Sequence, residues 1–182
     1  MLSRIDVRGS SEITKSLLSR PELSDDASLD TVREVIAEVR RRGDQALYEL
    51  TERFDGVRLD SLVVPSEVAV RALAGLERNL RDALEMTEVA VRNHHASRLG
   101  ADRTASDRGL RIRTVVRPVG RAGCYVPGGH AAYPSTVLMT AVVARVAGVE
   151  DVVVCVPPGT NGAVAETTLA ATVIAGVDTV HP

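Results

Sequence analysis

The sequence predicts an α/β fold in which a helical N-terminal region is followed by a parallel β-sheet with flanking helices. Through the first hundred residues, apolar side chains recur every three or four positions, as in amphipathic helices. Beyond residue 110, short valine-rich runs alternate with helical segments, which is typical of a parallel sheet covered on both faces. We therefore divide the 182 residues into a mainly helical region, 1–109, and a partial α/β domain, 110–182.

Periodicity and capping residues place the helices of the first region. Three helices are predicted: one capped by Asp30 and closed by Gly43, one from Asp44 to Gly56, and one from Ser66 to about His94 or Arg98. Between the second and third helices, Leu62 to Val64 is expected to be extended because Pro65 follows it. Charged side chains on the third helix lie at helical neighbour spacing and are interpreted as a solvated face.

The second region begins with a polar connector, residues 100–109, and a half-exposed strand that alternates from Leu110 to Val116. The segments that follow are a buried strand from Ala122, a helix capped by Ser135, a strand over 150–156, a helix over 163–175 and a strand over 176–180. Parallel strands joined by helices are expected to lie side by side in one sheet.

Composition excludes several classes of partner. The chain has 22 basic and 24 acidic side chains, a net charge of -2, and only three Tyr, one Phe and no Trp, so nucleic acid is not expected as a partner. The longest apolar run is far below the roughly 20 residues of a spanning helix, and no apolar segment of signal-peptide length opens the chain. We therefore expect a cytoplasmic protein without a membrane partner.

Two turns that follow predicted strands are candidate binding elements: Pro127 to His130, and Pro157 to Gly162. Ligands of parallel sheets bind beyond the carboxyl ends of the strands, and paired glycines such as Gly128 and Gly129 let backbone approach a phosphate. Glycine and proline also mark ordinary turns. Neither G-x-G-x-x-G nor G-x-x-x-x-G-K-[ST] occurs in the chain, so the ordinary turn is the preferred interpretation of these residues alone.

Cys124 is the candidate nucleophile, because it comes just before the first turn and a helix N-terminus there would lower its pKa. Packing of a small side chain in a strand is the alternative, and we favour it. His130 in the turn could contact a ligand. The adjacent His94 and His95 point in different directions on a helix, so histidine spacing assembles no metal site.

Longer motifs resemble a known family. The segment RPVGRAGCYVPGGHAAYPSTVLMTA at 117–141, with RRRGDQAL at 40–47, TERFDGV at 51–57 and AGVD at 175–178, closely resembles the histidinol dehydrogenase family. The resemblance covers nearly the whole chain. It implies incomplete Rossmann-like domains, an intertwined homodimer, and two successive NAD-dependent oxidations, from alcohol to aldehyde to carboxylate, at the end of histidine biosynthesis. The family reaction also uses a bound zinc and a glutamate–histidine acid–base pair.

The resemblance carries over to few site residues. Tyr125 matches the tyrosine of the family that touches NAD, and Gly128 and Gly129 match the glycine turn beside it, so these three are assigned to cofactor binding. Cys124 stands where the family usually has an apolar residue. Family members are more than twice as long, and their zinc ligands and acid–base pair match no position here. Zinc is therefore not expected, catalytic residues are not assigned, and NAD binding is expected to be weak.

Three functions remain open. The first is a truncated histidinol dehydrogenase homologue that lacks the zinc-dependent activity on its own. The second is a repurposed small-molecule binder or a non-redox enzyme of the isomerase or cyclase type, with Cys124, Tyr125 and His130 as its site. The third is an assembly module whose open sheet edge after Val180 pairs with another chain. The expected partners are a small-molecule ligand and a second copy in a homodimer or other oligomer.

Overall fold

A computed structural model describes residue 8, residues 26–128 and residues 131–182, and the chain forms two compact units, residues 1–43 and 44–182. The first unit contains α1 (Asp26–Arg42). Asp30 lies inside this helix and accepts a hydrogen bond from Arg33 at 2.8 Å, so it is not the predicted cap. Hydrogen bonds from Arg42 and then Arg41 hold the pKa of the Glu38 carboxyl below its ordinary value.

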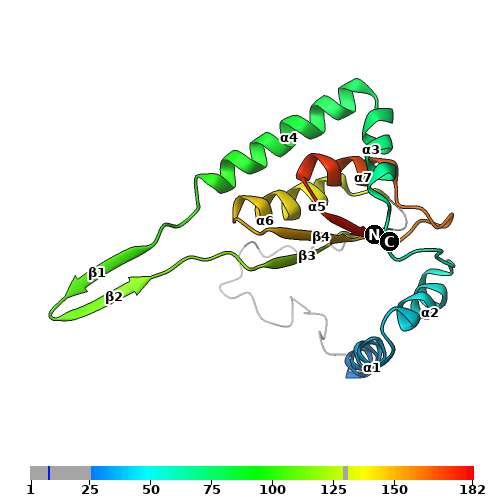
Figure 1. Ribbon diagram of the computed structural model, residues 1–182, viewed down its shortest axis with the longest axis horizontal. Helices are drawn as coiled ribbons and strands as arrows, with labels where there is room; N and C mark the ends of the chain where they lie inside the picture. Colours follow the sequence, from blue (N-terminus) through cyan, green and yellow to red (C-terminus); the bar gives the residue numbers. More distant parts are fainter. Residues whose placement is uncertain (1–7, 9–25, 129–130) are drawn as a thin grey trace. The chain divides into compact units, whose positions relative to one another are not determined.

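The second unit contains the remaining elements (Figure 1). Its helices are α2 (Asp44–Asp55), α3 (Ser66–Gly75), α4 (Arg78–Ala96), α5 (Pro134–Val137), the π-helical turn η2 (Leu138–Val142), α6 (Val143–Val146) and α7 (Glu166–Ala175). Its strands are β1 (Arg103–Asp107), β2 (Leu110–Thr114), β3 (Arg121–Tyr125), β4 (Asp151–Cys155) and β5 (Thr179–His181). In the part of the chain that the structure describes, none of the helices has the length and apolar composition that a membrane span needs.

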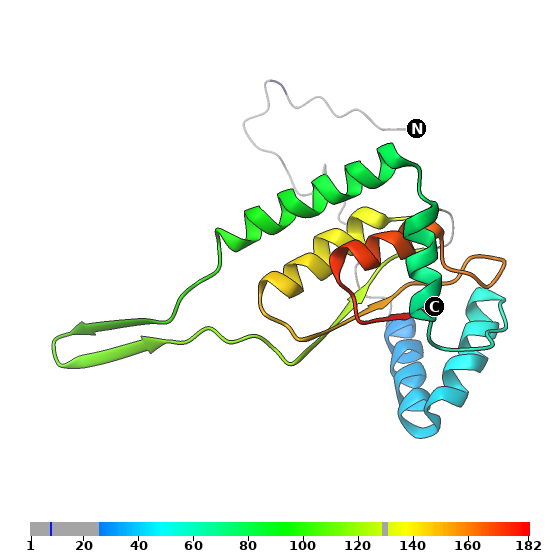
Figure 2. The same cartoon turned by 45° about the horizontal axis from the view of Figure 1, so that its top comes forward.

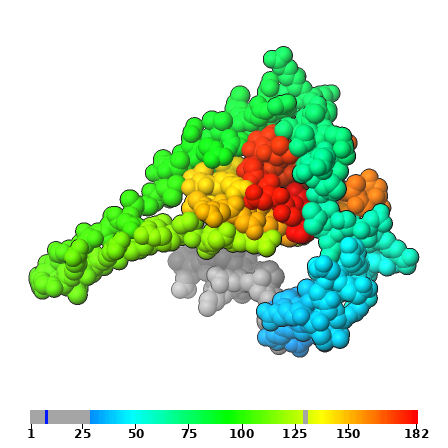
Figure 3. Space-filling model, in the orientation of Figure 1, coloured from blue at the N-terminus to red at the C-terminus, as the bar shows by residue number. Residues whose placement is uncertain are grey.

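The predicted long helix from Ser66 is two helices. The backbone is extended at Leu76, with φ of -66° and ψ of 141°, and again at Glu77, where ψ is 140°. Gly75 is the last residue of α3, consistent with the high backbone entropy that makes glycine a weak helix former. The break lets α3 pack against α7, as the space-filling view shows (Figure 3), while α4 runs on over η2 and α6.

The three strands β3, β4 and β5 form a parallel sheet in that order, which confirms the predicted α/β fold class. β4 is the central strand, with Tyr125 paired to Cys155 on one side and Val154 paired to Val180 on the other. The valine runs form these strands because β-branched side chains suit a buried, pleated surface. The helix over 163–175 begins later than predicted, at Glu166.

The core of the second unit lies between this sheet and its helices. Figures 1 and 2 show α5, η2, α6 and α7 on one face of the sheet. Fully buried side chains in this layer include Val126, Val137, Leu138, Val142, Val152 and Val154. The prediction that helices cover both faces of the sheet is therefore wrong for α5, η2, α6 and α7, which all lie on one face. On the opposite face Val153 is buried, but Tyr125 and Cys155 remain exposed.

The residues between α2 and α3 line the outer edge of β5. Leu62 to Val64 is not helical, but the backbone bends at Leu62 and Val63, where an extended segment was predicted. The Val64 N–H donates to the Val180 carbonyl at 2.9 Å. The ring Nδ1 of His181 lies 2.5 Å from the Leu62 carbonyl oxygen. The edge at Val180 is therefore occupied by the chain's own backbone, which corrects the expectation of an open edge there.

An antiparallel hairpin replaces most of the predicted polar connector. β1 and β2 are joined by Arg108 and Gly109, whose φ values of 46° and 81° suit a two-residue hairpin turn. Every residue of both strands is exposed. At the base of the hairpin, Asp102 accepts hydrogen bonds from the Val116 N–H at 3.1 Å and from Arg117 at 2.9 Å.

Arg145 at the end of the helical layer ties it to the sheet. Its guanidinium donates to the Val149 carbonyl at 3.0 Å, to the Gly176 carbonyl at 2.8 Å and to the Asp178 carboxylate at 2.6 Å. The same carboxylate accepts the Val152 N–H at 2.7 Å. One side chain thus joins α6, the start of β4 and the turn between α7 and β5.

The predicted cap at Ser135 is wrong. Helix α5 begins at Pro134 without a side-chain cap, and Ser135 lies inside it.

Candidate functional site

The two glycine-containing turns meet at the carboxyl ends of β3 and β4. The Val126 N–H donates to the Cys155 carbonyl at 2.8 Å, which continues the strand pairing into the turns. A Cβ atom at Gly128 would lie 2.8 Å from the Pro157 carbonyl oxygen, closer than real Cβ contacts allow. Gly128 is therefore needed for the first turn to pack on the second, a reason that differs from the phosphate approach inferred from the sequence.

A cavity of about 560 Å³ lies between the two turns. Gly128 and Pro157 form part of its wall, together with Asn161 in the second turn and Glu166 and Thr168 at the start of α7. Its volume falls in the range of small-ligand pockets. The structure thus brings both predicted turns to one cavity at the carboxyl edge of the sheet, where parallel sheets bind ligands.

The second turn is held by its own hydrogen bonds. The Asn161 side-chain oxygen accepts the Ala163 N–H at 3.1 Å, and the Gly159 N–H donates to the Ala163 carbonyl at 2.9 Å. Gly162 has a φ of 76°, a conformation that favours glycine, and donates to the Gly159 carbonyl at 2.8 Å. Asn161 was not among the predicted site residues, although Asn is a turn residue because its side chain bonds the backbone two positions on.

Tyr125 ends β3 on the sheet face opposite α5 to α7 and is 67% exposed. It does not line the cavity between the turns. Its neighbour across the sheet is Cys155, which shares this exposed face. Partial burial, and after it the nearby Cys124, raise the pKa of the Cys155 thiol above its ordinary value.

Cys124 points into the core with 7% exposure, on the face of β3 opposite to Tyr125. This position matches the packing interpretation and gives a ligand at the turn no access to the thiol. The two cysteines lie in neighbouring strands on opposite faces and both are free thiols. Gly129 and His130, the other predicted turn residues, lie outside the described residues.

The residues present do not fit the zinc that the resemblance implies for the family. Within residues 26–128 and 131–182, no group of three or more His, Cys, Asp or Glu side chains is placed to hold a metal ion. His94 and His95 lie in the last turn of α4 with their rings at 87° to each other and 5.0 Å apart, far from either glycine turn in sequence.

Comparison with known proteins agrees with the motifs. The family model for histidinol dehydrogenase matches residues 18–182. Histidinol dehydrogenase of Thermobifida fusca is 41% identical over 186 aligned residues, which cover 100% of this chain and 42% of that protein. Histidinol dehydrogenase of Methanothermobacter thermautotrophicus is 38% identical over 181 residues, covering 99% and 42% of the two chains.

A solved structure shares the fold. The crystal structure of histidinol dehydrogenase from Elizabethkingia anophelis superposes with a TM-score of 0.83 and 27% sequence identity, covering 92% of this chain and 39% of that one. The chain spans about two fifths of the length of the relatives it matches, and the match to the family model extends over both the α/β unit and its glycine turns. On this evidence, the chain belongs to the histidinol dehydrogenase family.

Proposed function

We propose that this chain forms part of the NAD site of a histidinol dehydrogenase, which oxidises histidinol to histidine. In this proposal Tyr125, Gly128 and Gly129 contact the cofactor. The observation that carries it is the exposure of Tyr125: an aromatic side chain that is 67% exposed ends β3, two residues before a turn that borders a ligand-sized cavity. Large aromatic side chains that stay exposed at the carboxyl edge of a parallel sheet suit a planar ligand.

Each residue has a definite task in this site. The Tyr125 ring offers an apolar face on which a flat ring of the dinucleotide stacks, and its hydroxyl adds a hydrogen-bonding group. Backbone amides of the glycine turn face the phosphates without side chains in the way. NAD, when bound, supplies the acceptor for the hydride that leaves the alcohol or the aldehyde hydrate.

The proposal also states what the 182 residues do by themselves. We infer that they bind NAD weakly and do not turn over histidinol, because the described residues offer no ligand set that fits the family's zinc. A general base and a metal are each worth roughly two or more powers of ten in rate. We further propose that the protein acts in the cytoplasm and pairs as a homodimer, as the family does.

Titration with NAD⁺ by calorimetry tests the cofactor contact. Tyr125→Ala is expected to weaken binding about tenfold, the loss that follows from one stacked ring. Phe54→Ala is the matched control, because Phe54 on α2 is also a largely exposed aromatic, at 57%, and lies outside the turns. If both variants bind NAD⁺ as the unmodified chain does, Tyr125 is not a cofactor contact.

A separate measurement tests whether the chain by itself oxidises histidinol. The purified chain is incubated with histidinol, NAD⁺ and Zn²⁺, and NADH is followed by its absorbance. We expect no NADH above the buffer rate. Sustained NADH formation that Tyr125→Ala abolishes would overturn this expectation while supporting the cofactor contact.

A further inference from the structure

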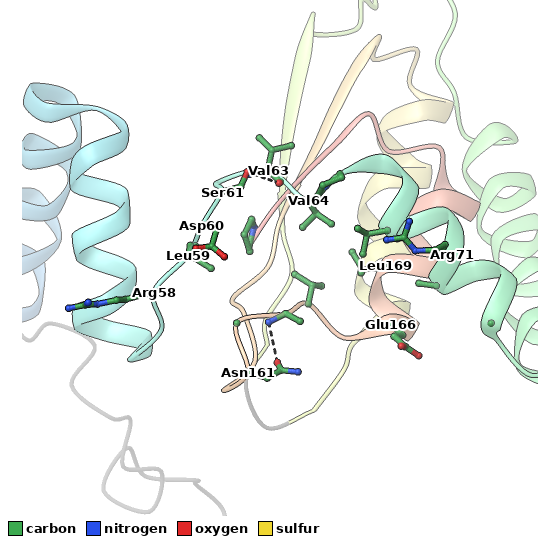
Figure 4. A pocket seen from close by; sticks show the side chains of 18 residues that line it. Arg58, Leu59, Asp60, Ser61, Val63, Val64, Arg71, Asn161, Glu166 and Leu169 are labelled. Atoms are coloured by element: carbon green, nitrogen blue, oxygen red, sulfur yellow. Dashed lines mark hydrogen bonds between the residues drawn. The ribbon is translucent and has the colours of Figure 1, made fainter.

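A second cavity, of about 510 Å³, lies in the same unit, and neither Tyr125 nor Gly128 lines it (Figure 4). The segment from Arg58 to Pro65 forms one side of it, and α3 and the start of α7 form the other. α3 follows the Arg58 to Pro65 segment directly, whereas α7 begins about a hundred residues later in the sequence. Their contact is fixed by the packing of α3 on α7 and by the Val64 hydrogen bond to β5.

The walls between the two sides are apolar. Val64 and Val68 line the cavity from the end of the segment and the start of α3, Ala72 follows one turn later, and Leu169 faces them from α7. Leu169 is 3% exposed and Ala72 is 8% exposed, so these side chains belong to the core and do not move freely. The cavity therefore has a fixed apolar floor of the kind that ligand pockets share.

Opposite charges lie on the two sides of this floor, and the Glu166 carboxylate at the start of α7 lines the cavity as well. Figure 4 shows the Asp60 carboxylate and the Arg71 guanidinium on opposite sides of the cavity. Within the described part of the chain, neither side chain has an ion-pair partner. Arg58, by contrast, points away from the cavity and pairs with Glu52 at 2.6 Å.

We propose that this cavity binds a small zwitterion whose cationic and anionic groups stand at opposite ends of an apolar body. The anionic group meets Arg71, the cationic group meets Asp60, and the apolar body covers the floor over Val68 and Leu169. The main-chain groups of an α-amino acid do not fit this pattern, because its ammonium and carboxylate groups are attached to the same carbon. Neither Tyr125 nor Gly128 lines this cavity, although Asn161 and Glu166 line both it and the cavity between the turns.

Three simple probes test the ligand class. They are 6-aminohexanoate, which carries both charges on an apolar chain, and hexanoate and hexylamine, which each carry one. Binding is measured by titration followed in amide NMR spectra of the whole chain. We expect 6-aminohexanoate to bind about tenfold more tightly than either single-charge probe, as one charge-assisted contact would give. Equal affinities for all three probes would mean an apolar hollow only and would overturn the proposal.

Variants locate the two charged contacts. Arg71→Gln is expected to weaken 6-aminohexanoate about tenfold and to leave hexylamine unchanged, while Asp60→Asn weakens it similarly and leaves hexanoate unchanged. Arg58→Gln is the matched control, because Arg58 lines the cavity but points away from it, and this variant should bind as before. If Arg58→Gln also loses binding, the Arg58 to Pro65 segment as a whole, and not the charges of Asp60 and Arg71, determines the affinity for 6-aminohexanoate, which would contradict the proposal.

Exchange of the two charges separates binding from folding. The double variant Asp60→Arg with Arg71→Asp keeps the net charge and is expected to bind 6-aminohexanoate in reversed orientation, within about threefold of the original affinity. Thermal unfolding of each variant confirms that the fold is kept, since both side chains are exposed. A folded double variant that binds no better than either single variant would contradict the proposed pairing.

Discussion

Two sets of strands in the same unit have opposite environments. β4 is five residues long and places Val152 and Val154 at 0% exposure, whereas β1 and β2, also five residues each, have no buried residue at all. Hydrogen bonding forms the ladder in both cases. The difference teaches that strand formation and burial are separate properties, because an isolated hairpin has little stability of its own unless other elements cover it. The stability of the unit is thus concentrated in the parallel sheet and its helices.

A pair of leucine substitutions offers the largest contrast. Leu138→Ala removes a side chain with 0% exposure beneath the π-helical turn, and it should lower the free energy of unfolding by about 3 kcal/mol through lost transfer energy and a cavity. Leu110→Ala in the hairpin, where Leu110 is 62% exposed, should change it by less than about 0.5 kcal/mol. Urea unfolding measures both. Similar losses would mean that the hairpin is packed against something in solution.

Two arginines give the next largest contrast. Arg145→Ala removes hydrogen bonds to three carbonyls and one carboxylate around the sheet, and it is expected to cost about 2 kcal/mol. Arg113→Ala removes one exposed ion pair, 3.4 Å from Asp102, and should cost about 0.5 kcal/mol or less. Urea unfolding of the two variants compares them. An equal cost would show that the Arg145 network contributes no more than a surface pair.

A pair of glycines tests whether the close packing of the sheet extends into its turns. Gly128→Ala should lower the free energy of unfolding by about 1.5 kcal/mol, because its Cβ would meet the Pro157 carbonyl at 2.8 Å. Gly123→Ala, in β3, meets nothing within 4 Å and is expected to be neutral. Thermal unfolding followed by circular dichroism compares them. A neutral Gly128→Ala would mean that the two turns separate easily.

The smallest effect is a local response of the hairpin to pH. Hydrogen bonds from Arg117, the Val116 N–H and Arg113 hold the pKa of the Asp102 carboxyl below its ordinary value. The bonds are therefore fully present above the unfolded pKa of about 4 and are lost as pH falls through the lower folded value. We expect the Val116 amide signal to shift in NMR spectra below about pH 4, while sheet amides stay in place. In Asp102→Asn that shift should be absent.

Local patterns predicted the sheet domain well. The valine run at β4 was predicted in place, because β-branched residues restrict the backbone by themselves. Leu62 to Val64, predicted to be extended before Pro65, is non-helical but bends at Leu62 and Val63. The break after Gly75 was missed, since the apolar period continues across it and only the extended Leu76 shows it. β1 was missed because its Ser, Thr, Asp and Arg residues have no apolar face, and the turn at Arg108-Gly109 lacks the Asn-Gly or Asp-Gly pair that signals a hairpin.

The candidate site was predicted in part. The meeting of the turns at Pro127 and Pro157 follows from the rule for parallel sheets and is found in the cavity between them. The roles of Tyr125 and Gly128 in cofactor binding stay predictions. The cavity beside Asp60 and Arg71 had no sequence signal, because it arises only when two distant segments pack together. Tertiary contacts of this kind leave no local pattern.

The short backbone contact between Leu62 to Val64 and β5 has a consequence for solubility. Exposed strand edges template the addition of strands from other molecules and lead to amyloid-like stacking. The Val64 N–H already uses the Val180 carbonyl, and the His181 ring lies against the Leu62 carbonyl oxygen. An incoming molecule would have to peel this segment away before it could add to β5. Unfolded copies in a concentrated solution therefore lack a template on this side of the folded protein.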